Sequence, residues 1–279
     1  GGIQMSAQFG GDQYIAGQKE PVIDMPTRFV DFMRVLVPMA GDDTTPEGEQ
    51  VNIYGNHVGS WNFAATAYLN QWKVKIYYEH YFDDHSQMFF QYGRWKDGHI
   101  GLEITFPKNR FIDTFVYEGL GTKDQTGPML YDSFWGEFEE QISAKDNYYN
   151  HYLYQGWQHW GMGIGNPLLP GPIYNKNGQI TFISNRVLAH HIGFCGSPCQ
   201  SLSYRMLLSY SRHWGTYDNP LNEIKKQFNS LFEVTYAPQQ LKGWSFTVSG
   251  AMDRGSMLGN NYGGMLVIRK QGIIKSGNK

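Results

Sequence analysis

The sequence predicts an all-β fold, in which antiparallel strands form a meander that is part of a transmembrane β-barrel. The first observation is a set of windows, each about 9–11 residues long, in which apolar and polar residues alternate. The second is that the links between these windows alternate between short and long. The third is composition, because 16% aromatic residues, 33 glycines and only 17% charged residues suit strands joined by many turns. We therefore treat residues 1–279 as one barrel domain.

The alternating windows have the length that a tilted strand needs to cross a bilayer, about 9–11 residues. Strands of soluble proteins more often run about 5–6 residues. In the window at 72–80, Trp72, Val74 and Ile76 share one face, and lysines share the other. The clearest windows are "WKVKIYYEH" at 72–80, "HIGLEITF" at 99–106, "LSYRMLLSYSR" at 202–212, "SLFEVTYAP" at 230–238 and "WSFTVSGAM" at 244–252. We expect about nine strands after residue 51, the last at 262–270, and one or two more within 1–10 and 28–37.

The links between the predicted strands give the stronger signal. Short links are expected at 69–71, 107–110, 196–200 and 238–242. Long links are expected at 81–97, 120–179, 214–229 and 254–261, and the polar stretch 40–50 falls on the same side. A meander with short turns at one end and long loops at the other is typical of outer-membrane barrels. The pattern therefore predicts an outer-membrane protein of a Gram-negative bacterium, with residues 120–179 as a long outward loop.

Several other classes of protein are disfavoured. A net charge of −2 gives no reason to expect a nucleic-acid partner. The most apolar stretch, 29–40, contains Asp31 and Arg34, so no transmembrane helix is expected. The first residues already resemble a strand and show no secretory signal. Cys195 and Cys199 form either a small disulfide or two free thiols, and their C-x3-C spacing is weak evidence for a metal.

Eight segments, taken in order, resemble the capsule-assembly Wzi family of Gram-negative outer-membrane proteins. They are "GNHVGSWNF", "YYEHYFDDHSQMFF", "WKDGHIGLEITFPKN", "VYEGLGTKDQTGP", "GWQHWGMGIGNPLL", "IYNKNG", "NRVLAHHIG" and "GGMLVIRK". The resemblance covers residues 45–270. It implies a barrel of about eighteen strands with an N-terminal periplasmic helical part. It also implies a lectin that helps attach capsular polysaccharide to the cell surface without catalysis.

The chain departs from that family pattern in two ways. It is shorter than the whole family fold, so we expect an N-terminally truncated fragment that contains about 10–11 of the barrel strands. The final residues, "GIIKSGNK", lack the terminal aromatic residue that such barrels usually carry. Both departures raise the question of whether these residues close into a barrel by themselves.

The long loop 120–179 carries the candidate binding residues. Sugar rings need flat apolar surfaces together with directional hydrogen-bonding groups, and this loop supplies both. Asn150, Gln155 and Gln158 supply polar groups beside the aromatic residues. The alternative is that the loop folds inward, so that its aromatic residues form a plug or a small core. The candidate polysaccharide-binding residues are Tyr148, Tyr149, Tyr152, Tyr154, Trp157, His159 and Trp160.

Other groups of residues are assigned structural roles. His80, Asp83, Asp84 and His85 have spacings that could hold a divalent cation, but a solvated rim is the favoured interpretation, and no metal or cofactor is expected. Alternation places His190 and His191 on opposite faces of one strand. The aromatic residues near strand ends are interpreted as membrane-interface anchors: Trp72, Trp244, Tyr204, Tyr210 and Tyr236.

The predicted function is therefore non-catalytic binding of capsular or surface polysaccharide by a monomer in contact with outer-membrane lipid. One alternative is a porin-like transport channel, with Arg205, Glu103 and Glu233 lining the lumen. Another is an enzyme that uses two carboxylates among Glu103, Asp113 and Glu118. Lumen-lining carboxylates explain Glu103 equally well.

Overall fold

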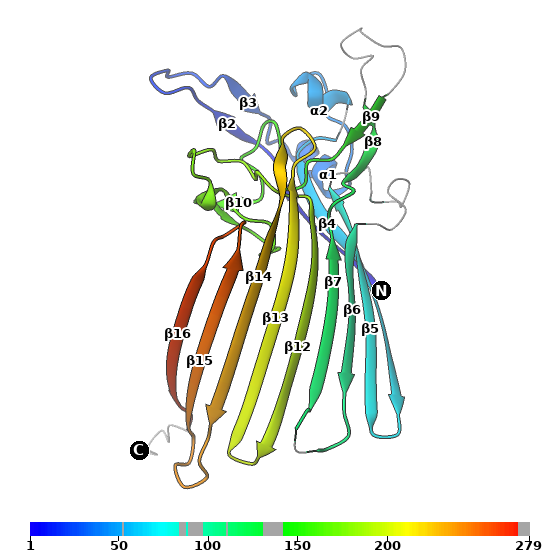
Figure 1. Cartoon of the computed structure of the whole chain (residues 1–279). Coiled ribbons are helices and arrows are strands. Elements are labelled where there is room, and N and C mark those ends of the chain that lie inside the picture. Colours follow the sequence, from blue (N-terminus) through cyan, green and yellow to red (C-terminus); the bar gives the residue numbers. More distant parts are fainter. Residues whose placement is uncertain (52, 84–87, 89–96, 110, 131–141, 273–279) are drawn as a thin grey trace, which may run out of the picture.

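The computed structural model describes residues 1–51, 53–83, 88, 97–109, 111–130 and 142–272 (Figure 1). Its main element is a ten-stranded sheet in the order β1-β4-β5-β6-β7-β12-β13-β14-β15-β16. Every pairing in this sheet is antiparallel, which confirms the predicted antiparallel all-β class. The strands are β1 (Gly2–Gln8), β4 (Asn56–Leu69), β5 (Trp72–Asp83), β6 (Gly98–Thr105), β7 (Thr114–Gly121), β12 (Val187–Cys199), β13 (Leu202–Gly215), β14 (Pro220–Tyr236), β15 (Trp244–Gly255) and β16 (Asn261–Lys270).

The smaller elements gather at one end of this sheet, drawn at the top of Figure 1. Three two-stranded pairs lie outside the main sheet: β2 (Gly11–Gln13) with β3 (Ile23–Met25), β8 (Thr126–Leu130) with β9 (Ile142–Lys145), and β10 (Gln158–His159) with β11 (Met162–Gly163). The helices are α1 (Phe29–Leu36), α2 (Glu47–Val51) and the 3-10 turn η2 (Pro172–Tyr174). The opposite end of the sheet carries the turns that join β4 to β5, β6 to β7, β12 to β13, and β14 to β15. The two ends therefore differ, but the predicted alternation of short and long links holds only in part.

Three of the predicted short links, 69–71, 107–110 and 238–242, adjoin or lie between paired strands, but the link predicted at 196–200 lies mostly within β12, which runs to Cys199. One predicted long link is also wrong. Residues 214–229 were expected to form a loop, yet β13 runs to Gly215 and β14 begins at Pro220. The stretch 221–227 lacks apolar alternation, which is why its sequence looked like a loop. It forms strand because its backbone pairs with β13, with Lys225 opposite His213 and Lys226 opposite Arg212. The link predicted at 254–261 also shortens, because β15 reaches Gly255 and β16 begins at Asn261.

The prediction of a strand within 28–37 is wrong, whereas that within 1–10 is confirmed by β1. Residues 29–36 form helix α1, because Phe29, Phe32, Met33 and Leu36 recur at helical spacing. Asp31 accepts the backbone N–H of Arg28 at 2.9 Å, which stabilises the start of the helix. The stretch 40–50 was expected to be a polar loop, but it includes most of α2.

The main sheet has an apolar face, on which the cross-strand register aligns large side chains. Val248 on β15 lies between Val234 on β14 and Leu266 on β16. The same alignment continues across β13, β12, β7, β6 and β5. Exposed members of the apolar face are Ile76, Ile100, Ile192, Tyr210, Phe232, Tyr236, Trp244, Val248, Leu266 and Ile268. A contiguous exposed apolar surface of this extent marks contact with another apolar phase or partner.

The opposite, polar face carries paired charges and hydrogen bonds. Lys73 lies 3.3 Å from Glu103, and Arg205 lies 3.3 Å from Glu233. Further along, Asn229 donates to Asp253 at 2.7 Å. The predicted interface anchors Trp72 and Trp244 lie near strand ends and pack on Phe106 and Phe246, with ring centroids 5.0 and 6.3 Å apart. The anchoring role of these residues stays a prediction.

Strands β1 and β16 form the two edges of the sheet. Within the described residues each pairs with a single neighbour, and the sheet does not close on itself. Among those same residues, no helix is both long and apolar enough to cross a membrane.

Two small cores hold the long loop against the end of the sheet. One consists of Leu169, Phe182, Val187 and Ala189, of which Ala189 belongs to the polar face of β12. The other consists of Met25, Val35 and Tyr54, with Leu153 and Tyr154 of the loop packed against it. Because the first core joins the loop to the polar face, this loop folds inward over that face.

Candidate functional site

The structure separates the seven predicted binding residues into three environments. Tyr148 and Trp157 are buried, and Tyr149 and Tyr154 are half-buried. Tyr152, His159 and Trp160 are exposed. An exposed ring can stack on a sugar, whereas a buried ring packs against other residues of the protein and stabilises the fold. The candidate surface therefore narrows to three exposed residues, at two places in the loop region.

Tyr148 is held by a buried carboxylate. Its hydroxyl donates to Asp97 Oδ2 at 3.1 Å, and the same carboxylate accepts the backbone N–H groups of Asp124 at 2.9 Å and Gln125 at 2.5 Å. Burial raises the pKa of Asp97 to about 6, although these three donors act in the opposite direction. Asp97 therefore ties residues 124, 125 and 148 together just outside β6.

The raised pKa of Asp97 gives a testable pH dependence. Because the folded-state pKa lies above the ordinary value of 3.8, the contribution of this group to stability is greatest below pH 3.8. It declines as the pH rises through about 6, by up to about 3 kcal/mol. We expect protease cleavage of residues 121–150 to become faster between pH 4 and pH 7. An Asp97→Asn variant, which cannot ionise, should show a flatter profile, and equal slopes would contradict this role.

Tyr149, Trp157 and Tyr154 form part of the loop framework. Tyr149 has a positive φ of 71°, and its hydroxyl accepts the backbone N–H of Asn166 at 2.9 Å. Its carbonyl accepts the N–H of Trp157 at 3.0 Å, and its ring meets Phe182 edge-on at 5.2 Å. Tyr154 packs against the core around Tyr54. These residues fix the shape of the loop, so their replacement would act through folding as well as binding.

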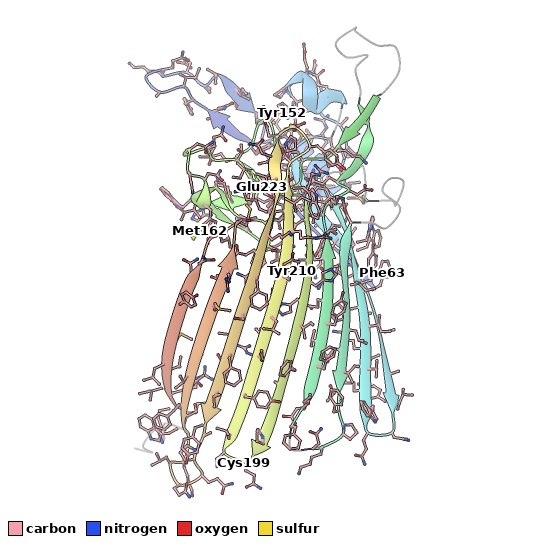
Figure 2. The ribbon with its side chains drawn as sticks, viewed as in Figure 1. Phe63, Tyr152, Met162, Cys199, Tyr210 and Glu223 are labelled. Carbon is pink, nitrogen blue, oxygen red and sulfur yellow. The ribbon has the colours of Figure 1, made fainter. Side chains whose placement is uncertain are left out.

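Tyr152 lies in the group of loops above the sheet, where Figure 2 labels it. Its hydroxyl donates to Glu49 Oε1 at 3.0 Å, and its ring stacks on His151 at 4.9 Å with an angle of 27°. Glu49 is itself buried and accepts the backbone N–H of Gly55 at 2.6 Å. Helix α2 therefore fixes the orientation of an exposed aromatic ring.

An open cleft of about 770 Å³ lies beside Tyr152, and amide and hydroxyl side chains dominate its lining. We call it the amide cleft. Asn150 donates to Asn147 Oδ1 at 2.9 Å and to the carbonyl of Phe182 at 2.9 Å, so the amides are held in fixed orientations. Besides Tyr152, the amide and hydroxyl residues of the lining are Asn147, Asn150, Gln179, Thr181, Thr216 and Asn219, and Glu49, Lys145 and His151 also line the cleft. Ordered amides beside an aromatic ring are suited to binding sugar hydroxyls and C–H groups.

The second exposed place is the hairpin of β10 and β11. Trp160 has a positive φ of 52°, and its ring lies 6.1 Å from that of His159, edge to face. Gln158 Oε1 accepts the N–H of Gly161 at 2.7 Å and closes the turn. Figure 2 places Met162 of this hairpin at the side of the molecule, apart from Tyr152. The seven predicted residues do not form one continuous surface.

The remaining candidates are widely separated. His80 and Asp83 are buried, whereas Asp84 and His85 lie outside the described residues. Glu103 pairs with Lys73, and Asp113 accepts from Ser197 Oγ at 2.8 Å at the short-turn end. Cys195 and Cys199 are free thiols. Within the described ranges, no group of three or more His, Cys, Asp or Glu residues could hold a metal ion.

The composition of the amide cleft was not predicted from the sequence. Asn147 and Gln179 lie far apart within the connection between β7 and β12, and Thr216 and Asn219 lie in the turn between β13 and β14. No local spacing links the two pairs. Among the amide residues of the cleft, only Asn150 was predicted to be a hydrogen-bonding residue. Comparison of the sequence with protein-family models finds no match, and comparison with curated proteins finds none either.

Proposed function

We propose that the ten-stranded sheet is part of an outer-membrane β-barrel that binds capsular or surface polysaccharide and helps to attach it to the cell surface. The observation that carries this proposal is the amide cleft beside the stacked rings of Tyr152 and His151. The sequence resemblance to the capsule-assembly Wzi family supports the same ligand class. No bond is made or broken in this function.

The two faces of the sheet support the membrane location. Lipid-facing residues of a membrane barrel are apolar, and lumen-facing residues are polar. The apolar face exposes Val248 and Leu266 among many others, whereas the polar face pairs Lys73 with Glu103 and Arg205 with Glu233. In this orientation the short turns face the periplasm, and the long loops face outward.

The proposed binding is weak at each contact and strong along a polymer. The ring of Tyr152 would stack on one sugar, while amides of the cleft hydrogen-bond its hydroxyls. The exposed pair His159 and Trp160 offers a second contact at the same end of the sheet. A repeating polymer gains affinity when several such contacts are made together.

The first test is retention of purified capsular polysaccharide by the detergent-solubilised protein. A Tyr152→Ala change is expected to reduce retention about threefold to tenfold, because it removes one stacking surface. Tyr174→Ala is the matched control, since both tyrosines are 62% exposed and Tyr174 does not line the cleft. Equal retention by both variants would rule out Tyr152 as a sugar contact, and no retention by the unmodified protein would rule out the proposed function.

A porin-like channel is the second candidate, and the ion pairs of the polar face favour it. Channel interiors are polar and carry charges that set selectivity. The inward-folded loop, held by Leu169 and Phe182, opposes it because the loop covers one end of that face. Conductance across a planar bilayer separates the candidates, because a channel conducts ions whether or not polysaccharide is retained.

A further inference from the structure

A second cavity, of about 510 Å³, lies between the polar face and the inward-folded loop. We call it the inner cavity. One wall consists of residues from β4, β5, β6, β7, β12 and β13, and the other consists of residues 148–149 and 165–169 of the loop. Its volume falls within the range of small-molecule sites, about 300–1,000 Å³. It shares no lining residue with the amide cleft.

The strand wall of the inner cavity presents hydrogen-bonding groups on adjacent strands. His99 Nε2 lies 3.5 Å from Glu118 Oε1, and His99 Nδ1 lies 3.8 Å from Glu79 Oε2. Tyr77 donates its hydroxyl proton to Glu118. On the next strands, His191 Nδ1 lies 2.5 Å from Ser209 Oγ. One imidazole thus bridges two carboxylates, and this network holds all three side chains in place.

The loop wall of the inner cavity is mainly apolar. Leu168 and Leu169 face the cavity, and Leu169 is anchored in the core with Phe182. Two polar groups interrupt this wall: the Tyr149 hydroxyl and Asn166, whose backbone N–H donates to that hydroxyl. The cavity therefore has an apolar side facing a side rich in carboxylate and imidazole groups.

We infer that the inner cavity binds one uncharged pyranose residue. A pyranose has an apolar C–H face, which can pack against Leu168 and Leu169. It also has hydroxyl groups, which can donate strong hydrogen bonds to carboxylates. A uronic-acid carboxylate in the same position would face Glu79 and Glu118 with His99 between them. Even when His99 is protonated, the two carboxylates leave these three groups with a net negative charge, and like charges at short range repel. The inference rests on the proposed function, because it takes the ligand to be a residue of the bound polysaccharide.

The test uses small sugars rather than the polymer. Saturation-transfer NMR on the detergent-solubilised protein would compare methyl α-glucoside and methyl α-galactoside with sodium glucuronate. We expect transfer to at least one methyl glycoside and at least about fivefold less transfer to glucuronate. Equal transfer to glucuronate, or none to either glycoside, would overturn the inference.

Two pairs of variants connect that signal to the cavity. Glu79→Gln should weaken glycoside binding at least about threefold, because it removes a charged hydrogen-bond acceptor from the cavity wall. Glu103→Gln is the control and should leave binding unchanged, because Glu103 lies outside the cavity and pairs with Lys73. Leu168→Trp should fill the space and abolish the signal, whereas Ile164→Trp, an exposed change in the same loop, should not. Retained binding in Leu168→Trp would place the sugar elsewhere.

Failure of the inference can be distinguished from failure of the proposed function. If the unmodified protein retains polysaccharide but binds no methyl glycoside, the inner cavity is not a sugar site, and the proposed function stands on the Tyr152 result. If it retains no polysaccharide, the proposed function fails whatever the NMR result. If Leu168→Trp loses the glycoside signal but keeps near-normal polymer retention, the inner cavity and the amide cleft have separate roles.

Discussion

Leu266→Arg is expected to destabilise the protein by about 2–4 kcal/mol in the proposed membrane-inserted state, as charged residues do on the lipid face of a barrel near the bilayer centre. Leu266 lies near the middle of β16, opposite Val248, and its side chain is 64% exposed on the apolar face. In lipid an arginine at this position would lose its hydration without gaining a partner. The measurement is equilibrium unfolding by urea in lipid bilayers, followed by tryptophan fluorescence.

Met265→Arg is the matched control for this change. Met265 is the preceding residue of the same strand, is 56% exposed, and pairs with Ser249 on the polar face. An arginine there meets a polar surface, so we expect a change of less than about 1 kcal/mol. Equal effects of the two variants would contradict the assignment of the apolar face to lipid. A larger effect of Met265→Arg would indicate that the face carrying Met265, and not the face carrying Leu266, contacts lipid.

Phe182→Ala is expected to release the long loop from the polar face, at a cost of about 3–5 kcal/mol. Phe182 is 1% exposed and packs with Leu169, Val187 and Ala189, so its loss leaves a cavity in the small core that holds the loop. Its backbone also makes two hydrogen bonds with the Asn150 side chain, but these two bonds contribute little to the stability of the loop. The measurement is the rate of protease cleavage within residues 146–186, together with urea unfolding.

Ile180→Ala is the control for the loop core, because Ile180 is two residues away and 55% exposed. We expect its cleavage rate to stay near that of the unmodified protein. Since Phe182 lines the amide cleft and Leu169 lines the inner cavity, Phe182→Ala should also weaken binding at both places. Unchanged cleavage in Phe182→Ala would show that other contacts, such as those of Asp97 and Tyr148, hold the loop.

Local periodicity was enough to predict most of the sheet. The alternation in 72–80, 202–212 and 244–252 identified strands and their faces, because one face is apolar throughout and side chains alternate with a period of two. It failed at 221–227, where charged residues on both faces hide a strand that the pairing with β13 stabilises. It also failed at 29–36, where apolar residues at helical spacing were read as a strand.

The candidate site was much harder to predict than the strands. Sequence reasoning found the loop that carries Tyr152 and Trp160, but it could not separate these exposed rings from the buried rings of Tyr148 and Trp157. Burial in a loop depends on contacts made far along the chain, such as that of Tyr148 with Asp97. The inner cavity also depends on contacts far along the chain, since His99 on β6 and His191 on β12 are brought to the two sides of β7 only in the folded sheet.

The pairing of β7 with β12 has a consequence for how the chain reaches its fold. Several neighbouring strands are joined by tight turns, as where β12 ends at Cys199 and β13 begins at Leu202. By contrast, Val187 contacts Thr122 across a separation of 65 residues. Closing that segment costs about 2–3 kcal/mol more chain entropy than closing a tight turn. Assembly is therefore expected to proceed as two local meanders, β4–β7 and β12–β16, which join last along this seam.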